Sequence, residues 1–265
     1  MKIGFIGLGN MASAMIGGIL KKGLVEPCDI IGSARTEETK RRAEEKFGII
    51  AAASNAEAAS EAEVLFLAVK PVFFHEVIEE IRDAVKADTL IVSIAAGISL
   101  SRLREEFGRE ELKLIRCMPN TPALVLEGCT GVCMAESVTK PEAERVLEML
   151  RAFGTASIVP ERLMDVVTGV SGSSPAYVFM FIEAMADEAV AAGMPRKQAY
   201  EFAAQSVMGS AKLVLETGRH PAELKDMVCS PGGTTIQAVK VLEEKGMRAA
   251  VMDAMEACIQ KSKNM

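Results

Sequence analysis

The stretch Lys2-Ile3-Gly4-Phe5-Ile6-Gly7-Leu8-Gly9-Asn10-Met11-Ala12 decides the fold of this chain. It begins with an apolar run of strand length, and the residues Met11–Lys22 have the pattern of a helix. Gly7, Gly9 and Ala12 fit the pattern G-x-G-x-x-A, which permits a tight turn, a close approach to a pyrophosphate, and packing of helix against strand. An anion is favoured at such a helix N-terminus by free N–H groups and by the helix dipole. The stretch therefore predicts the first β-α unit of a dinucleotide-binding domain.

Strands and helices alternate through the first half of the chain. The predicted strands are Lys2–Gly7, Asp29–Ser33, Val64–Val69, Leu90–Ile94, Lys113–Arg116 and a strand near Ser157–Val159, and the further predicted helices are Thr36–Phe47, Val77–Val85, Leu100–Phe107 and Pro141–Phe153. Uniformly apolar strands separated by helices indicate a parallel sheet that is covered on both faces. The fold class is therefore α/β, with a Rossmann-type doubly wound parallel sheet over residues 1–160 that we expect to bind a dinucleotide.

The second half of the chain is predicted to be helical, because no strand candidates remain after about Arg162. Four helices are expected: one around Val178–Val190, one from the Gly193-Met194-Pro195 break to about Thr217, one after Pro231-Gly232-Gly233, and one over Met247–Lys261. Helices this broadly apolar in so small a domain need more partner surface than one copy offers. We predict an all-α dimerisation domain over residues 161–265, and a homodimer or a higher homo-oligomer built from dimers. Residues 1–160 alone should be monomeric and inactive.

Composition excludes several classes of function. The formal net charge of -6 argues against a nucleic-acid-binding protein, which needs a basic face. The most apolar later segment, Ala176–Ala192, holds three carboxylates, so no membrane span is expected. The six cysteines form no C-x-x-C pair and the two histidines stand far apart, so no metal site is expected. The apolar start resembles a signal peptide, but Asn10 interrupts it and the helix continues to Lys22. We therefore expect a cytoplasmic protein, without a membrane or nucleic-acid partner.

The end of the second predicted strand indicates the choice of cofactor. An NAD-selective site usually carries an acid there, which binds the ribose 2′-hydroxyl. This chain has Ser33-Ala34-Arg35-Thr36, with no acid before Glu37. A hydroxyl and a guanidinium suit a 2′-phosphate, although Arg35 could also be an ordinary solvated loop residue. We predict NADPH as the cofactor and NADH as a poorer substitute.

A second distinctive stretch is Ser230-Pro231-Gly232-Gly233-Thr234-Thr235. A tight turn that opens a helix presents backbone N–H groups and hydroxyls to one point, which suits a small carboxylate. Without further context, the same residues read equally well as a helix cap.

Several stretches resemble the pyrroline-5-carboxylate reductase family, and together they cover essentially the whole chain in order. They are Phe5-Ile6-Gly7-Leu8-Gly9-Asn10-Met11, Ala68-Val69-Lys70-Pro71, Ala95-Ala96-Gly97, Arg116-Cys117-Met118-Pro119-Asn120-Thr121-Pro122, Thr168-Gly169-Val170-Ser171-Gly172-Ser173-Ser174-Pro175-Ala176-Tyr177, and the segment from Leu224 to Thr235. The resemblance implies hydride transfer from NADPH to the C=N bond of 1-pyrroline-5-carboxylate, which gives L-proline in the last step of proline biosynthesis.

The resemblance also implies roles for individual residues. The cofactor would be bound by Gly7, Gly9, Asn10 and Met11 at its pyrophosphate, by Ser33 and Arg35 at its ribose phosphate, by Asn55, Ala68, Lys70 and Pro71 along its cleft, and by Ala95 and Ala96 near its nicotinamide. The small-molecule substrate would be held by Ser230, Gly232, Gly233, Thr234 and Thr235, from the same or the second subunit. Position 218 is glycine, where some family members carry an acid.

Thr235 is the predicted catalytic residue, because a hydroxyl can donate to or accept from the ring nitrogen of either imine or amine. No general acid is assigned, and His220 is expected to begin a helix before Pro221. Two other functions remain open. A hydroxyacid dehydrogenase of the 3-hydroxyisobutyrate type would need a lysine at a glycine-rich helix start, for which Lys212 is a weak candidate. A non-enzymatic NADP-sensing protein would bind cofactor without turnover.

Overall fold

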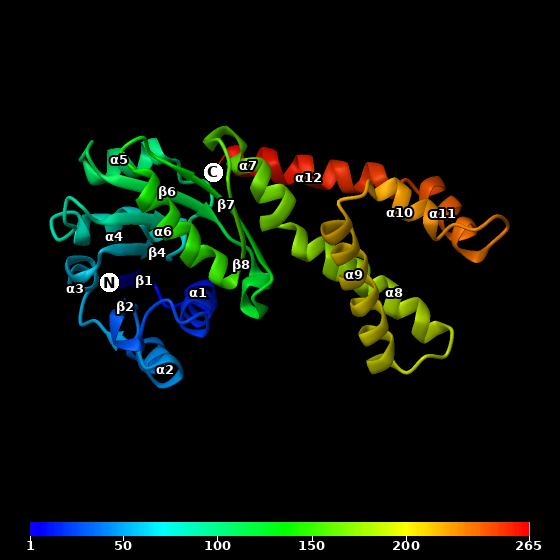
Figure 1. Cartoon of the computed structure of the whole chain (residues 1–265), viewed down its shortest axis with the longest axis horizontal. Coiled ribbons are helices and arrows are strands. Elements are labelled where there is room, and N and C mark those ends of the chain that lie inside the picture. The colour runs from blue at the N-terminus through cyan, green and yellow to red at the C-terminus, as the bar shows by residue number, and fades with distance from the viewer. Residues whose placement is uncertain (265) are drawn as a thin grey trace. The chain divides into compact units, whose positions relative to one another are not determined.

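The computed structural model describes residues 1–264, which form two compact units (Figure 1). The first consists of Met1–Ser173 and the segment from Cys258 onward, and we call it the sheet unit. The second is Ser174–Ala257, and we call it the helical unit.

The sheet unit contains one eight-stranded sheet in the order β3-β2-β1-β4-β5-β6-β7-β8. The strands are β1 (Ile3–Ile6), β2 (Ile30–Ser33), β3 (Ile50–Ala51), β4 (Val64–Leu67), β5 (Leu90–Ser93), β6 (Lys113–Met118), β7 (Gly128–Met134) and β8 (Gly154–Ile158). The helices between them are α1 (Asn10–Lys21), α2 (Glu37–Phe47), α3 (Asn55–Glu61), α4 (Phe74–Ile81), α5 (Leu100–Phe107), α6 (Lys140–Leu150) and the short α7 (Met164–Val167). Strands β1 to β6 are mutually parallel, which confirms the predicted doubly wound architecture.

The core lies on both faces of this sheet, because successive side chains of a strand point to opposite sides. In β4, Phe66 joins the cluster that contains Met15 of α1 and Leu147 of α6. Its neighbour Leu65 joins the other cluster, with Ile78 of α4. Buried on both faces, the strands must be apolar throughout, which is why their sequence shows no polar alternation.

Strand β7 was not predicted, and its direction corrects the expectation of a wholly parallel sheet. It pairs antiparallel with β6, and β8 then runs parallel to β7. The chain passes from β6 to β7 through a short 3₁₀ turn over Thr121–Val125, without a crossover helix. A parallel return needs a longer crossover, so the chain must run back beside β6. The sequence of β7, with two glycines among seven residues, hid the strand.

The helical unit confirms the predicted absence of strands in its described residues. Its helices are α8 (Ser174–Ala191), α9 (Arg196–Thr217), α10 (Pro221–Met227), α11 (Thr234–Glu244) and α12 (Met247–Lys263), whose last turns belong to the sheet unit. The four long helices agree with the prediction, and the short α10 begins at Pro221, where His220 was expected to start a helix. Large apolar side chains are exposed along these helices, and Leu215 is 82% and Met180 is 70% exposed. Such surface is typical of an interface with another chain.

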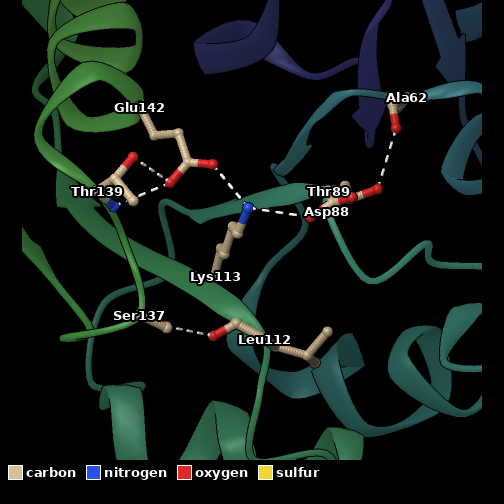
Figure 2. A network of polar contacts seen from close by, with 8 residues as sticks. All are labelled: Ala62, Asp88, Thr89, Leu112, Lys113, Ser137, Thr139 and Glu142. Atoms are coloured by element: carbon tan, nitrogen blue, oxygen red, sulfur yellow. Dashed lines mark hydrogen bonds and ion pairs between the residues drawn. The ribbon is translucent and has the colours of Figure 1, made fainter.

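At the amino ends of the parallel strands, a polar network joins two strands to α6 (Figure 2). Lys113 Nζ, at the start of β6, donates to Asp88 Oδ1 at 3.1 Å and to Glu142 Oε1 at 2.7 Å. The other carboxylate oxygen of Glu142 accepts from the Thr139 backbone N–H at 2.9 Å and from its hydroxyl at 2.7 Å. The Lys113 ammonium, followed by Thr139, lowers the pKa of Glu142 to about 2. The network attaches the first turn of α6 to the amino ends of β5 and β6.

We expect Glu142→Gln to lower the stability of the protein at neutral pH. Because the folded pKa of Glu142 lies below its ordinary value of 4.5, its contribution is complete above that pH and is lost as the pH falls towards about 2. The gap in melting temperature between wild type and variant should therefore close over this acid range. Glu144→Gln is the control, since Glu144 belongs to an exposed ion pair with Arg151, which contributes little. A gap that does not change with pH would contradict the assignment.

Candidate cofactor cleft and substrate loop

A cleft of about 830 Å³ opens at the carboxyl ends of β1, β2 and β4. The strand order reverses here, since β1 is followed on one side by β2 and on the other by β4. Ligands of open α/β sheets bind in the crevice at such a reversal. Of the residues predicted to bind the cofactor, those that line the cleft are Gly7, Ser33, Arg35, Asn55, Ala68 and Lys70.

The remaining predicted residues do not line this cleft, although most of them are neighbours in sequence of residues that do. Gly9, Asn10 and Met11 lie at the start of α1, directly after Gly7 and Leu8, which line the cleft. Pro71 follows Lys70, and Ala95 and Ala96 follow the carboxyl end of β5. Glu76, Glu80 and Phe73 line the cleft and were missed by the sequence analysis.

The turn after β1 fits a dinucleotide pyrophosphate. Gly7 has φ of +94°, and a Cβ there would lie 2.6 Å from the carbonyl oxygen of Ala68, so a side chain is excluded by the protein itself. A Cβ on Gly9 would meet nothing within 4 Å, so packing within the protein does not require this glycine. No side chain caps α1, which leaves N–H groups of its first turn free for an anion.

We therefore expect Gly9→Ala to fold normally but to bind NADPH about tenfold or more weakly, because the methyl group would hold a pyrophosphate away from the amides. Titration calorimetry measures the affinity, and thermal melting confirms the fold. Gly209→Ala is the matched control, since a Cβ at Gly209 also meets nothing within 4 Å but lies in α9 of the helical unit. Wild-type affinity in Gly9→Ala would remove the pyrophosphate from this helix start.

Beside the Gly7 turn, three side chains of the cleft form a chain of hydrogen bonds. The Ser33 hydroxyl, which is buried, donates to Asn55 Oδ1 at 2.6 Å. Asn55 Nδ2 donates in turn to Glu80 Oε2 at 2.5 Å. The Arg35 guanidinium lies 5.3 Å from the centroid of the Phe73 ring, which holds it beside the cleft by a cation–π contact.

The loop that is predicted to bind the substrate, Ser230–Thr235, lies in the helical unit after α10 and includes the start of α11. Gly232 has φ of +70°, and Gly233 takes the N-cap position of α11 with extended backbone. No side chain caps this helix, so the reading of Thr234 and Thr235 as capping residues is wrong. Ser230 and Thr234 are exposed and Thr235 is half-buried. The loop thus presents free backbone N–H groups and hydroxyls, which suit a carboxylate.

The structure also places His220 and Lys212, which the sequence analysis considered for a helix start and for a dehydrogenase lysine. His220 caps α10 and accepts from the backbone N–H of Ala222 at 3.2 Å, which confirms its predicted place at a helix start. Lys212 lies inside α9 and forms an exposed ion pair with Glu216 at 3.5 Å. That position does not match the helix-start lysine that a hydroxyacid dehydrogenase would need.

The side chain of Asn120 connects two of the motifs that resemble the reductase family, Arg116–Pro122 and Thr168–Tyr177. Its buried amide donates to the carbonyl oxygen of Ser171 at 2.9 Å and accepts from the backbone N–H of Cys129 at 2.8 Å. Ser171 belongs to a π-helical turn over Thr168–Gly172, a local structure that is frequent at functional sites. Asn120 therefore ties the segment that leads into α8 to the start of β7.

Among the described residues, no helix combines the length and apolar character needed to span a bilayer. No group of three or more His, Cys, Asp or Glu side chains among them could hold a metal ion.

Two family models match the chain. Residues 161–265 match a model described as pyrroline-5-carboxylate reductase dimerisation, and residues 2–97 match one described as NADP oxidoreductase, coenzyme F420-dependent. The C-terminal part of the chain thus matches a reductase dimerisation region and the N-terminal part matches an NADP oxidoreductase region, with residues 98–160 between the two.

Relatives match over the full length. A pyrroline-5-carboxylate reductase of Escherichia coli is 54% identical over 264 residues, which cover 100% of this chain and 98% of that protein. One from Methanosarcina acetivorans is 46% identical over 264 residues, covering 100% of this chain and 97% of that protein. The crystal structure of a Plasmodium falciparum pyrroline carboxylate reductase with NADP bound superposes with a TM-score of 0.91 at 31% identity, covering 100% of this chain and 97% of that chain. This chain therefore belongs to the pyrroline-5-carboxylate reductase family.

Proposed function

We propose that this protein reduces the C=N bond of 1-pyrroline-5-carboxylate with NADPH, giving L-proline. The observation that carries the proposal is the similarity over the full chain to reductases that are named for this substrate, 54% identical in one case. The cleft beside Gly7, Ser33 and Arg35 supports the cofactor, since it joins an open helix start to a hydroxyl and a guanidinium.

The proposed roles divide between the cleft of the sheet unit and the Ser230–Thr235 loop of the helical unit. In the sheet unit, Gly7, Gly9, Asn10 and Met11 bind the pyrophosphate, and Ser33 and Arg35 bind the 2′-phosphate. Asn55, Ala68, Lys70 and Pro71 line the cleft, with Ala95 and Ala96 on the nicotinamide side. Bound NADPH supplies the hydride. The chain itself contributes orientation, charge neutralisation and exclusion of alternative geometries.

In the helical unit, the loop from Ser230 to Thr235 holds the substrate carboxylate by its N–H groups and hydroxyls. Thr235 contacts the ring nitrogen. The substrate is most electrophilic as the iminium, and addition of hydride to its carbon converts C=N⁺–H into the neutral C–N–H of the amine. Charge and electrons balance without a protein acid. A threonine hydroxyl suits this nitrogen, because it can accept from the iminium and donate to the amine.

A spectrophotometric assay tests the function. Loss of NADPH absorbance that depends on 1-pyrroline-5-carboxylate, with proline identified by mass spectrometry, is the expected result. Cofactor binding without turnover would support the non-enzymatic alternative, and NADP⁺ reduction by a 3-hydroxy acid would support the dehydrogenase. Either of these two results would overturn the proposal.

We propose further that the protein is a homodimer, or a larger oligomer built from dimers, and that it works in the cytoplasm. The matched dimerisation model and the exposed apolar helices support the assembly. The six cysteines are all free, which agrees with a reducing compartment. The enzyme would then act on a dissolved small molecule.

The double variant Phe179→Asp/Phe202→Asp should shift the protein to monomers in light scattering. Both side chains are 61% exposed in a single chain, and burying two carboxylates in an interface is strongly unfavourable. Val72→Asp is the control, because Val72 is an apolar residue of the sheet unit that is 78% exposed. An oligomer that survives the double variant would place the interface elsewhere.

A further inference from the structure

The hydrogen-bond chain Ser33–Asn55–Glu80 has a fixed direction, and this direction bears on cofactor choice. A carboxylate oxygen can only accept, so the Asn55 group facing Glu80 must be the NH₂. The carbonyl oxygen of Asn55 consequently faces Ser33. A carbonyl oxygen also only accepts, so the Ser33 hydroxyl must give its proton to Asn55. Glu80 thus determines, through Asn55, which way the Ser33 proton points.

A hydroxyl whose proton is already used offers only lone pairs to a ligand. A ribose 2′-hydroxyl can donate to these lone pairs, whereas a 2′-phosphate dianion has no proton to donate. For Ser33 to donate to the phosphate, its bond to Asn55 at 2.6 Å must first be given up. Arg35, which lines the same cleft, favours the phosphate through its charge. The hydrogen-bonded Ser33 hydroxyl and the Arg35 guanidinium therefore act on a 2′-phosphate in opposite senses.

We propose that Glu80 is a positioning residue for cofactor choice, which keeps the NADPH preference moderate and lets NADH compete. The inference rests on the proposed use of a nicotinamide dinucleotide in this cleft. Glu80 acts through Asn55 and Ser33 and does not itself touch the cofactor. Its placement on α4 explains how a residue 25 positions away from Asn55 enters this network.

The experiment compares dissociation constants for NADPH and NADH, measured by titration calorimetry on the whole protein. In Glu80→Gln the side chain can offer either its amide NH₂ or its carbonyl to Asn55, so Asn55 is free to turn its NH₂ towards Ser33. The Ser33 hydroxyl then accepts that bond and directs its proton into the cleft. We expect the ratio Kd(NADH)/Kd(NADPH) to rise about five- to tenfold, as for a partly recovered hydrogen bond to a charged group.

Removing any negative charge near the phosphate would also favour NADPH, so a charge control is needed. Glu76→Gln serves this purpose, because Glu76 lines the same cleft, while the side-chain hydrogen bonds of Asn55 in the described structure go to Ser33 and Glu80. It should change the ratio by less than about twofold, and 0.5 M salt should abolish that change by screening. The effect of Glu80→Gln should persist at this salt concentration.

The Asn55→Ala background completes the test. With Asn55 removed, Ser33 already has its proton free, so adding Glu80→Gln should change the ratio no more than Glu76→Gln does. An equal effect of both glutamine variants, or a full effect of Glu80→Gln without Asn55, would overturn the proposal. A wild-type protein that binds neither dinucleotide would instead refute the proposed function, so the two failures are distinct.

Discussion

The Arg35→Asp variant is expected to use NADH better than NADPH, reversing the preference of the wild-type protein. Arg35 lies at the end of the cleft next to Ser33, and its guanidinium is held against Phe73 at 5.3 Å. An aspartate there would repel a 2′-phosphate and accept from a ribose 2′-hydroxyl. Loss of the charged hydrogen bonds together with the new repulsion should lower kcat/KM for NADPH by about two to three decades.

Steady-state kinetics with both cofactors at matched concentrations give the comparison. Arg41→Asp is a suitable control, since Arg41 carries the same charge on α2, its side chain is 73% exposed, and it does not line the cleft. The control should retain the wild-type preference. If the wild-type protein itself has a lower KM for NADH, the assignment of Arg35 is wrong and the residue is only a solvated loop cation.

The sequence predicted the first β-α unit well because local chemistry determines it. Gly7 must be glycine first for a local reason, its φ of +94°, and the approach of the Ala68 carbonyl after β4 adds a tertiary contact that the sequence does not show. The apolar strands were equally visible, since burial on both faces requires an uninterrupted apolar run. The site residues Gly7, Ser33 and Arg35 were predicted from this unit and its neighbour, and all three line the cleft.

Strand β7 shows where such local reasoning fails. Gly131 stands in the middle of this strand because a Cβ there would lie 2.7 Å from the Val167 side chain, which packs against it from α7. A contact with a segment distant in sequence therefore requires this glycine, whereas the sequence alone indicates a turn residue. The direction of β7 likewise depends on the connection before it and not on its own composition.

The cleft wall formed by α4 was missed for a related reason. Phe73 precedes the predicted helix Val77–Val85, and Glu80 has the position of an ordinary acid on the solvated face of that amphipathic helix. Only the packing of α4 against the sheet brings them beside Arg35 and Asn55. A spacing of four residues between Glu76 and Glu80 fits a helix face that borders a cleft as well as one in bulk water. Nothing in the sequence distinguishes the two.

Thr235→Val is expected to lower kcat/KM for pyrroline-5-carboxylate by about one to two decades, because a hydrogen bond to a charged nitrogen contributes about 1.5–3 kcal/mol. Valine keeps the shape of the side chain and removes only the hydroxyl. The affinity for NADPH should hardly change, since the residues proposed to bind the cofactor belong to the sheet unit and Thr235 belongs to the helical unit. A selective loss of this kind would separate the substrate loop from the cofactor cleft.

Folding of the Thr235→Val variant should also survive, and the structure gives the reason. The N-cap of α11 is Gly233, no side chain caps this helix, and Thr235 is a half-buried residue of its first turn. Removing the hydroxyl therefore breaks no capping bond, and valine is close to threonine in helix propensity.

Thr234→Val, one residue earlier and exposed, is the matched control and should lose less activity. Melting temperature and kcat/KM measured on the same preparations separate the two roles. A stable Thr235→Val protein with unaltered kcat/KM would remove the Thr235 hydroxyl from the reaction, and the ring nitrogen would then have to be oriented by other groups of the loop.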